Sequence, residues 1–375
     1  MDKYIVTKNR IVIVGMSGGV DSSVAATLLK EQGYEVIGVF MHFWHDVADK
    51  LEAIDMHIEN RCCSREAEES ARSVAQKLGI RFYSLNVSKE FKKAVVDYFL
   101  SEYDSGRTPN PCIECNREIK FGIMIDKAMA MGADYVATGH YAINLKFKMK
   151  NEKFRYKLLK AKDENKDQSY FLYTLTQKKL EHCLFPIGDY QKSEVREIAK
   201  RFGLSVHDRK ESQEICFIHT KFYGDFLKKY LTLKPGKIVN AKGHVLGDHK
   251  GLPLYTIGQR RDIGLGGSGP YYVIGFDRRK NHLMVSNDPR DPKLYSKEII
   301  AEKVIWTSGK TPKMPMRIKA KIRYRMQEVS AIVDKKSGKY RVKFSKPQRA
   351  AMPGQSVVFY KGREVIGGGV IKHFR

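Results

Sequence analysis

The sequence has no long apolar run, few cysteines and a shortage of acidic residues, and the first two of these exclude whole classes of protein. Its longest apolar stretches fall far short of the about 20 residues that cross a bilayer, so we expect no membrane anchor. Met1-Asp2-Lys3-Tyr4 is followed by Lys8 and Arg10 before any hydrophobic core, which does not resemble a secretory signal. Six cysteines in 375 residues are too few for a disulfide scaffold. We therefore expect a cytoplasmic globular protein whose cysteines are thiols, metal ligands or catalytic groups.

The shortage of acidic residues points to a polyanionic partner. The chain has 68 Lys and Arg against 42 Asp and Glu, a formal net charge of +26. From Asp288 to Arg375, 22 basic residues face 7 acidic ones, a surplus of 15 in the last quarter of the chain. A basic organism with solvated surfaces is the alternative explanation. Because the charge is concentrated toward one end, the pattern favours nucleic acid.

The first part of the chain has the rhythm of an α/β domain. A helical pattern, a glycine and an apolar strand follow one another four times, with the strands expected at 34–39, 80–83, 134–137 and 204–206. A glycine just after a helix takes the left-handed closing conformation at little cost. Strands that alternate with helices predict a parallel sheet covered on both faces, with ligands at the C-terminal ends of the strands.

The remainder of the chain predicts two smaller units. Gly and polar residues dominate between Thr232 and Tyr272, where we expect only short strands. From about Lys303 the pattern alternates, and Ser337-Gly338 is typical of a hairpin turn, which together predict a small β-barrel. Apolar residues of one strand share a face at Met316, Ile318, Ala320, Ile322 and Tyr324, and basic ones share the other at Lys319, Lys321, Arg323 and Arg325. The predicted domains are 1–215, 216–285 and 286–375.

The run Ser17-Gly18-Gly19-Val20-Asp21-Ser22-Ser23 follows the apolar strand 11–15 and is the most informative stretch. A small-residue loop that enters a helix directs N–H groups and the positive end of the helix dipole at one spot, which suits a phosphate. Asp21 is placed to hold Mg2+ or to orient the loop. A Gly/Ser turn that caps an ordinary helix is the alternative. The run resembles the PP-loop of ATP pyrophosphatases, which implies cleavage of ATP between its α and β phosphates.

Cysteines fall into three groups. Cys112 and Cys115 form a C-x-x-C pair, and Cys115 and Cys216 lie in polar, loop-like contexts that favour chemistry. The adjacent Cys62 and Cys63 favour a surface or packing role, and Cys183 lies in an apolar, helical-looking stretch that favours burial. A zinc site would need a second such pair or added His, and nothing around Cys112 resembles a thioredoxin unit.

Motifs spread over nearly the whole chain are similar to those of the tRNA-specific 2-thiouridylases (the MnmA/TrmU family), members of the PP-loop ATP pyrophosphatase superfamily. They lie at 107–121, 137–141, 165–172, 214–218, 255–260, 323–325 and 353–356, in addition to the Ser17 loop. The resemblance implies an adenine nucleotide α-hydrolase-like N-terminal domain with a parallel sheet, a small central domain that binds tRNA, and a basic C-terminal β-barrel that also binds tRNA.

The same resemblance implies an ATP-dependent 2-thiolation of the wobble uridine of tRNA. Uridine O2 would be adenylated by ATP with Mg2+, and the products would be 2-thiouridine, AMP and pyrophosphate. Cys216 would carry a persulfide received from a sulfur-relay protein or cysteine desulfurase, and Cys115 would be the nucleophile that leaves a transient Cys115–Cys216 disulfide. ATP would be bound by Gly15, Met16, Ser17, Gly18, Gly19, Val20, Asp21, Ser22, Met41 and Gly139.

By resemblance, the target base enters a pocket lined by Asn110, Pro111 and Cys112. Contacts with the anticodon stem-loop of tRNA are implied for His140, Lys166, Asp167, Gln168, Arg323, Tyr324 and Gln355. On residue chemistry alone, Asp167 would instead cap a helix that starts at Ser169, and His140 would be a hydrogen-bonded histidine at a strand end. Cys112 stands where many relatives have Asp, which is thought to help as an acid or base.

Two other functions compete with this interpretation. One is another PP-loop ligase or thiolase acting on a different substrate, including the iron–sulfur tRNA thiolases that need a cluster-binding set of cysteines. The other is a metal- or redox-sensing RNA-binding protein that uses Cys112 and Cys115. The Ser17 loop and Asp21 would have no purpose in that second function.

Overall fold

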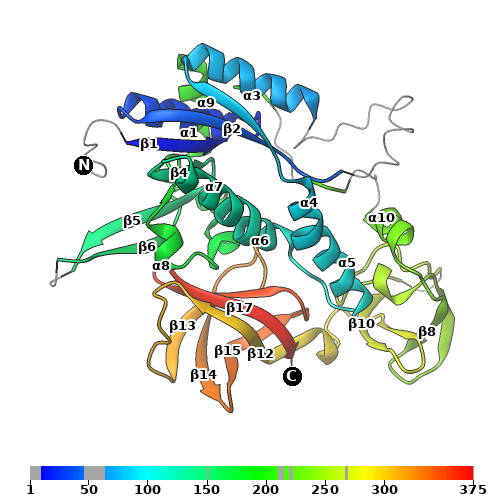
Figure 1. Cartoon of the computed structure of the whole chain (residues 1–375). Helices are drawn as coiled ribbons and strands as arrows, with labels where there is room; N and C mark the ends of the chain where they lie inside the picture. Colours follow the sequence, from blue (N-terminus) through cyan, green and yellow to red (C-terminus); the bar gives the residue numbers. More distant parts are fainter. Residues whose placement is uncertain are drawn as a thin grey trace.

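The computed structural model describes residues 10–45, 64–149, 152–209, 215–218, 223–266 and 269–374, so Cys62 and Cys63 lie outside the described residues. Three units are arranged around a common centre, with a parallel α/β unit above a β-barrel and a smaller β unit beside both (Figure 1). In this described part of the chain, no helix combines the length and the apolarity that a membrane crossing requires. The parallel sheet and the barrel that the sequence predicts are both present.

The N-terminal unit is built on five parallel strands in the order β3-β2-β1-β4-β7. Their bounds are β1 Ile11–Gly15, β2 Glu35–His42, β3 Arg81–Asn86, β4 Tyr135–Thr138 and β7 Cys183–Leu184. One face packs on α1 (Val20–Glu31), α3 (Arg65–Leu78) and α9 (Lys192–Arg201). The other face packs on residues of α4 (Ser88–Phe91), α5 (Asp97–Asp104), α6 (Pro111–Glu114) and α7 (Met124–Ala130), and of π-helical segments at Lys92–Val96 and Cys115–Ile123. The strands are therefore covered on both faces, as predicted.

Glycines close the helices where the sequence places them, but the fourth predicted strand is wrong. Gly33, Gly79, Gly132 and Gly203 all have positive φ, from 60° to 86°. Residues 204–206 form a turn and no strand. Leu204 and Val206 instead insert into the core beside α9, where both are at most 2% exposed. The fifth strand is β7, so Cys183 lies in a strand and not in the expected helix, although its predicted burial is confirmed.

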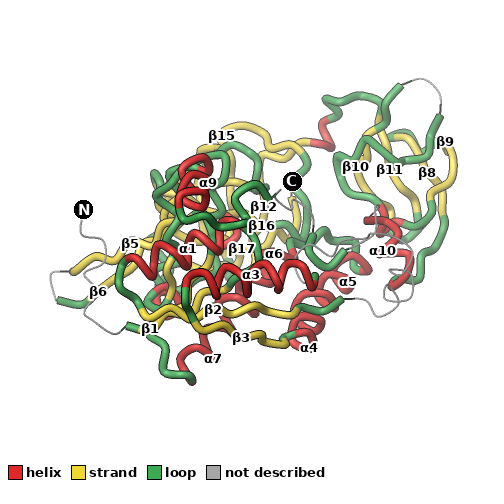
Figure 2. Tube along the Cα trace, turned by 90° about the horizontal axis from the view of Figure 1, so that it is seen from above, coloured by secondary structure: helices red, strands yellow, loops and turns green. Residues whose placement is uncertain are grey.

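The central unit begins with α10 (Tyr223–Tyr230) and contains a four-stranded sheet in the order β10-β11-β8-β9. The strands are short, as predicted: β8 Gly236–Asn240, β9 Val245–His249, β10 Tyr272–Asp277 and β11 His282–Ser286. A small core of its own includes Ile238, Val273 and Leu283. Seen from above, this unit lies at one end of the molecule, opposite the β5–β6 hairpin (β5 Ala142–Lys148, β6 Phe154–Lys160) (Figure 2).

Six strands of the C-terminal unit form a barrel that closes where β12 pairs with β17. They are β12 Tyr295–Trp306, β13 Met316–Lys321, β14 Val329–Lys336, β15 Lys339–Arg349, β16 Ser356–Lys361 and β17 Glu364–Phe374. The hairpin turn at Ser337-Gly338 is confirmed between β14 and β15. Ile318 and Ala320 point into the core as predicted, but β13 ends at Lys321. Arg323 and Tyr324 therefore do not continue the alternation and lie in the turn that follows.

The β5–β6 hairpin joins the N-terminal unit to the barrel. β6 pairs with β17 through Leu159↔Glu364 and Leu158↔Val365, so the barrel sheet continues into a hairpin that comes from much earlier in the chain. The ion pair between Lys157 and Glu364, 3.2 Å apart, crosses the same contact. The two units thus share backbone hydrogen bonds as well as side-chain packing.

Candidate functional site

One cavity of about 340 Å³ opens at the C-terminal ends of the parallel strands. Gly15 ends β1, Thr138 ends β4 and Met41 is the penultimate residue of β2, and all three line it. This is the edge where ligands gather in parallel α/β sheets. The residues that the sequence analysis singles out and that line the cavity are Gly15, Met16, Ser17, Asp21, Ser22, Met41, Pro111, Cys112, Cys115, Gly139, His140, Gln168 and Cys216.

The Ser17 loop holds its shape with its own hydroxyl groups. Ser22 Oγ accepts from the Ser17 N–H at 3.1 Å and lies 3.2 Å from the Gly19 carbonyl oxygen, to which it donates. Gly18 has φ +72°, and a Cβ there would meet the Ala67 carbonyl oxygen at 2.2 Å. Gly19 precedes α1 without a side-chain cap, so the first N–H groups of a helix of 12 residues are left for another acceptor. A Cβ on Gly139 would lie 2.6 Å from the Ser22 nitrogen, so the strand end also presses against this loop.

Asp21 forms a partly buried ion pair with Lys192 that the sequence analysis does not predict. Lys192 Nζ lies 2.7 and 2.9 Å from the two Asp21 carboxylate oxygens, and Tyr141 donates its hydroxyl to Oδ1 at 2.8 Å. The Lys192 side chain is only 12% exposed. The loop carboxylate is therefore oriented by a cation and a hydroxyl from two other elements.

A second cation reaches the same loop. Arg209 donates to the Gly18 carbonyl oxygen at 2.8 Å, and Lys120 lines the cavity. Together with Lys192, these residues give the loop end of the cavity a positive surrounding that suits a polyphosphate. No spacing in the sequence connects Lys192 or Arg209 with the loop. Lys192 reaches it because α9 packs against α1, and Arg209 follows α9 in the chain.

The far end of the cavity is aromatic. Phe43, Phe91 and Phe217 line it, with ring centroids 4.8 Å apart for Phe43 and Phe91 and 5.8 Å apart for Phe91 and Phe217. Phe217 is 2% exposed and also packs edge-on against Phe99 at 5.3 Å. This aromatic cluster fixes the short segment 215–218 and with it the position of Cys216.

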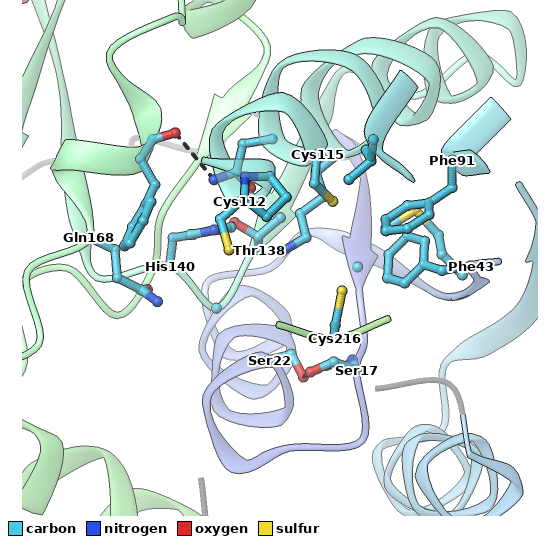
Figure 3. Close-up of a pocket in the computed structure, with 18 of the residues that line it drawn as sticks. Ser17, Ser22, Phe43, Phe91, Cys112, Cys115, Thr138, His140, Gln168 and Cys216 are labelled. Atoms are coloured by element: carbon cyan, nitrogen blue, oxygen red, sulfur yellow. Dashed lines mark hydrogen bonds between the residues drawn. The ribbon is translucent and has the colours of Figure 1, made fainter. Parts of the chain in front are cut away.

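Among the described residues, three cysteine thiols line the cavity. Cys112 is exposed, Cys115 is 6% exposed and Cys216 is intermediate. Asn110 occupies the N-cap position of α6 without a side-chain capping bond, Cys112 lies in the first turn, and Cys115 continues the helix into the π-helical segment. Figure 3 shows the Cys216 sulfur directed toward the helix that carries Cys112 and Cys115. Two thiols far apart in sequence, Cys115 and Cys216, thus come together beside the Ser17 loop.

Cys183 is a contrasting thiol in the core. It is 1% exposed and donates to the Lys179 carbonyl oxygen at 3.0 Å. Burial raises the pKa of the Cys183 thiol far above its usual range, so it stays protonated and unreactive.

His140 is a buried, neutral histidine at the end of β4. Its Nδ1 lies 2.7 Å from the Thr138 hydroxyl oxygen, and desolvation, aided by the Lys120 charge, holds the His140 pKa well below 6.5. This geometry matches the strand-end alternative considered from the sequence. The ring nevertheless lines the cavity, so it can offer a neutral imidazole to a ligand.

The segment Lys166-Asp167-Gln168 is divided between the cavity and the core. Gln168 lines the cavity and its Oε1 accepts from the Tyr141 N–H at 3.0 Å. Asp167 is 5% exposed and accepts from Ala161 N at 3.0 Å and from Ser169 N at 3.2 Å. The short 3-10 helix Ser169–Leu172 has Gln168 at its N-cap position, so Asp167 supports the turn before this helix and is not its cap residue. Desolvation raises the Asp167 pKa. Lys166 is half-buried and does not line the cavity.

Arg323, Tyr324 and Gln355 lie where the barrel meets the N-terminal unit, a contact that we call the barrel junction. Gln355 Nε2 donates to the carbonyl oxygens of Thr108 and Pro109, at 3.0 and 3.1 Å. Arg323 donates to the Ala350 carbonyl oxygen at 2.6 Å, and the Tyr324 ring packs 4.5 Å from that of Phe171. None of the three lines the cavity, and Gln355 instead holds the segment that leads into Asn110.

Asn116 is a cavity residue to which the sequence analysis assigns no role. It is 3% exposed, and its Nδ2 donates to the Phe171 carbonyl oxygen at 3.2 Å. Its Oδ1 has no hydrogen-bond partner among the described residues. Within the same described ranges, no three His, Cys, Asp or Glu side chains are grouped so that they could hold a metal ion.

Family models match the chain in three successive pieces. A tRNA methyl transferase HUP domain matches residues 10–220, a tRNA methyl transferase PRC-barrel domain 224–287, and an aminomethyltransferase beta-barrel domain 296–371. Although these descriptions mention methyl transfer, curated relatives of nearly full length have another name. The chain is 48% identical to a tRNA-specific 2-thiouridylase MnmA of Acetivibrio thermocellus, over 96% of this chain and 99% of that one.

Two further matches complete the comparison. A tRNA-specific 2-thiouridylase MnmA 1 of Clostridium botulinum is 49% identical, again over 96% of this chain and 99% of the relative. A solved 4-thiouridine synthetase–RNA complex with bound ATP aligns with a TM-score of 0.31 and 17% identity, over 59% of this chain and 49% of that one. The structural likeness is too distant to assign a ligand, whereas the curated relatives span the whole chain.

Proposed function

This chain belongs to the tRNA-specific 2-thiouridylase family of the MnmA type and is a tRNA sulfurtransferase that catalyses tRNA 2-thiolation, and we propose that the reaction takes place in the cavity at the ends of the parallel strands. The observation that carries the proposal is the common cavity itself. Cys115, Cys216 and the Ser17 loop come from three distant parts of the sequence and line one space.

The proposed first step is adenylation of O2 of the wobble uridine by ATP. The triphosphate lies on the Ser17 loop, where helix N–H groups, Lys192 and Arg209 face it, and Gly15, Met16, Met41 and Gly139 form the wall beside it. Attack by O2 on the α-phosphorus releases pyrophosphate and leaves AMP on the base. An oxygen that is otherwise a poor leaving group then departs as part of AMP.

Asp21 is the carboxylate that would hold Mg2+ beside these phosphates. Mg2+ in phosphate-transfer sites uses one or two carboxylates and completes its shell with phosphate oxygens and water, so a single Asp fits. When bound, the ion offsets charge on the triphosphate. In the structure the Asp21 carboxylate is paired with Lys192. When Mg2+ and ATP bind, the Lys192 ammonium group would exchange this carboxylate for a phosphate oxygen.

The proposed second stage moves sulfur. A persulfide on Cys216 attacks C2 of the adenylated base, a carbon–sulfur bond forms, and AMP leaves. Cys115 then attacks the Cys216 Sγ, breaks the sulfur–sulfur bond, and releases 2-thiouridine with a Cys115–Cys216 disulfide left behind. A sulfur-relay protein or cysteine desulfurase would supply the persulfide. The proposal also includes a cytoplasmic location for the enzyme, where it would meet tRNA and this sulfur donor.

The target uridine is proposed to leave the anticodon stack and to lie against Pro111, Cys112 and the aromatic end of the cavity. Asn110 does not line the cavity itself but directly precedes Pro111 at the N-cap position of α6, and its contact with the base remains a prediction. The central unit and the barrel would hold the anticodon stem-loop, and the predicted domain limits at 215 and 285 remain part of this proposal. The tRNA contacts expected of Arg323, Tyr324 and Gln355 also remain predictions, since the structure places these residues in the barrel junction.

Mass spectrometry of tRNA nucleosides tests the proposal. Wild-type protein incubated with tRNA, ATP, Mg2+, cysteine and a cysteine desulfurase that supplies persulfide sulfur should form 2-thiouridine. Cys115→Ser and Cys216→Ser should each abolish it while ATP-dependent pyrophosphate release persists, because adenylation needs neither thiol. Cys183→Ala, which alters a core thiol, should retain product formation. Full thiolation by Cys115→Ser would refute the two-cysteine scheme.

A further inference from the structure

We propose that Asp163 is a positioning residue for the ATP step, because it holds Lys192 in the place from which that lysine reaches the Asp21 carboxylate. Asp163 lies in the loop 161–168, between β6 and the turn at Ser169, and is only 6% exposed. It does not line the cavity, so its effect on the reaction passes through other residues. This role rests on the proposed function, which places ATP beside Asp21.

Both carboxylate oxygens of Asp163 accept backbone N–H groups. Oδ1 accepts from Asn165 N at 3.0 Å and from Lys166 N at 3.2 Å, which fixes the turn at 163–166. Oδ2 accepts from Lys192 N, the first residue of α9, at 3.0 Å. One buried carboxylate therefore ties this turn to the start of a helix by charge-assisted hydrogen bonds, and such bonds are the strong ones.

Lys192 connects this tie to the proposed phosphate site. Its backbone N–H is bound by Asp163, and its Nζ lies 2.7 and 2.9 Å from the two carboxylate oxygens of Asp21. The backbone and the ammonium group of one residue are thus fixed by two different carboxylates. Because the dipole of a helix also favours a carboxylate beside its first turn, Asp163 stabilises α9 in the position that directs Lys192 toward the Ser17 loop.

The start of α9 has a second support, which separates the formation of the helix from its placement. Gln191 and Glu194 form a capping box within the helix, and Gln191 N donates to Glu194 Oε2 at 2.5 Å. The helix can therefore begin at Lys192 without Asp163. Asp163 adds the link to the loop 161–168, so its loss should shift the first turn of α9 without unfolding the helix.

The same loop approaches Asp21 along another path. Tyr141 N donates to Gln168 Oε1 at 3.0 Å, and Gln168 N donates to the Tyr141 carbonyl oxygen at 2.8 Å. Tyr141 in turn donates its hydroxyl to Asp21 Oδ1 at 2.8 Å. Gln168 also lines the cavity. One short loop thus borders the ligand space and holds two groups that bind the Asp21 carboxylate.

A double-mutant cycle tests this role by nucleotide binding. The affinity for α,β-methylene-ATP, which cannot be cleaved between its α and β phosphates, is measured by titration calorimetry with Mg2+. Loss of a charge-assisted contact with phosphate should weaken binding by about tenfold in Lys192→Met. Asp163→Ala should weaken it by at least about threefold, but in the Lys192→Met background it should change nothing further, since both substitutions remove the same contact.

Asp163→Asn isolates the link to α9 from the turn. Its Oδ1 can still accept from Asn165 and Lys166, whereas its NH2 group faces the N–H of Lys192 and cannot accept from it. This variant should lower analogue affinity as Asp163→Ala does. It also keeps the test decisive if Asp163→Ala does not fold. Wild-type affinity in folded Asp163→Asn would overturn the positioning role.

Asp134→Ala is the matched control for stability. Asp134 accepts from Ile11 N at 2.9 Å and pairs with Arg10 at 3.1 Å, so it anchors β1 at the end away from the Ser17 loop. This variant should lose stability in urea unfolding and keep its analogue affinity. Equal losses for Asp163→Ala in the wild-type and Lys192→Met backgrounds, or a loss of affinity in Asp134→Ala as large as that in Asp163→Ala, would overturn the proposal.

Nucleoside mass spectrometry separates this role from the proposed reaction. A wild type that binds the analogue and shows the non-additive cycle, but forms no 2-thiouridine in tRNA, would contradict the reaction and support the positioning role. A wild type that forms 2-thiouridine while the two losses of affinity simply add would contradict the positioning role alone.

Discussion

The cavity and the barrel junction meet at the segment from Arg107 to Cys112, and they use their polar residues differently. Along the cavity, thiols, an imidazole and helix N–H groups border an open space. In the junction, the polar groups of Arg323 and Gln355 bond to backbone carbonyls of the protein itself. Resemblance had assigned ligands to both sets. A motif therefore identifies functionally important residues, but it does not distinguish those that contact the substrate from those that position the cavity wall.

The largest expected effect lies in the cavity. Gly139→Ala places a Cβ 2.6 Å from the Ser22 nitrogen and so displaces the start of α1. Because shifts of about 1 Å at a reacting site can cost about 100-fold in rate, we expect ATP-dependent pyrophosphate release to fall at least 100-fold with tRNA affinity retained. Gly266→Ala, with open space around the added Cβ, is the control. If Gly139→Ala also lost tRNA affinity, the Ser17 loop would serve tRNA binding as well as ATP chemistry, and the proposed division of roles between the two regions would be wrong.

The second prediction tests whether tRNA binds to the basic outer surface of the barrel, away from both the cavity and the barrel junction. Arg317 and Lys319 are exposed on β13 and Lys343 is exposed on β15, and these two strands flank β14. Each phosphate contact contributes about one to the slope of log affinity against log salt. The triple alanine variant should lower the slope by about three and weaken binding at least tenfold in filter assays. Lys92→Ala, which removes an exposed lysine paired with Asp97 in the N-terminal unit, should change neither.

A smaller effect is expected in the barrel junction. Gln355→Ala leaves the Thr108 and Pro109 carbonyls without their donor, which should destabilise the protein by about 1–3 kcal/mol in urea unfolding. Thiolation should fall with it, because the segment before Asn110 loosens, while tRNA affinity stays constant. Gln327→Ala, at an exposed barrel position, is the matched control. Loss of tRNA affinity at unchanged stability would show that Gln355 contacts RNA instead.

The smallest effect concerns pH. The His140 pKa is held well below 6.5 in the folded state. As pH falls below about 6.5, His140 is therefore protonated in the unfolded chain but stays neutral in the folded chain. Stability is lost in that window with a slope of at most about 1.4 kcal/mol per pH unit from this group. The slope of unfolding free energy between pH 6.5 and 5 should be shallower in His140→Gln. Equal slopes would mean that His140 is charged in the folded protein.

Features that depend on residues adjacent in the sequence were predicted correctly. The Ser17 loop, the four closing glycines and the hairpin at Ser337-Gly338 depend on neighbouring residues, and the structure has each of them as expected. The cavity brings Cys115 and Cys216 together, but their relation was implied by resemblance, since no spacing joins them.

Features set by tertiary packing escaped the sequence analysis. Lys192 reaches Asp21 only because α9 packs on α1, and residues 204–206 form a turn because burial beside α9 outweighs their strand propensity. Likewise, β13 ends at Lys321, which turns Arg323 toward the Ala350 carbonyl in place of the expected outward face.

The pairing of β6 with β17 has a practical consequence for dissecting the enzyme. Deleting the barrel would strip β6 of its neighbour, leave Lys160 without its backbone bond to Arg363, and uncover a bare strand edge on the remaining fragment. Such a truncation would be prone to aggregate, and a drop in RNA affinity would then report misfolding. The role of the barrel is better probed by surface substitutions in the intact chain than by cutting it away.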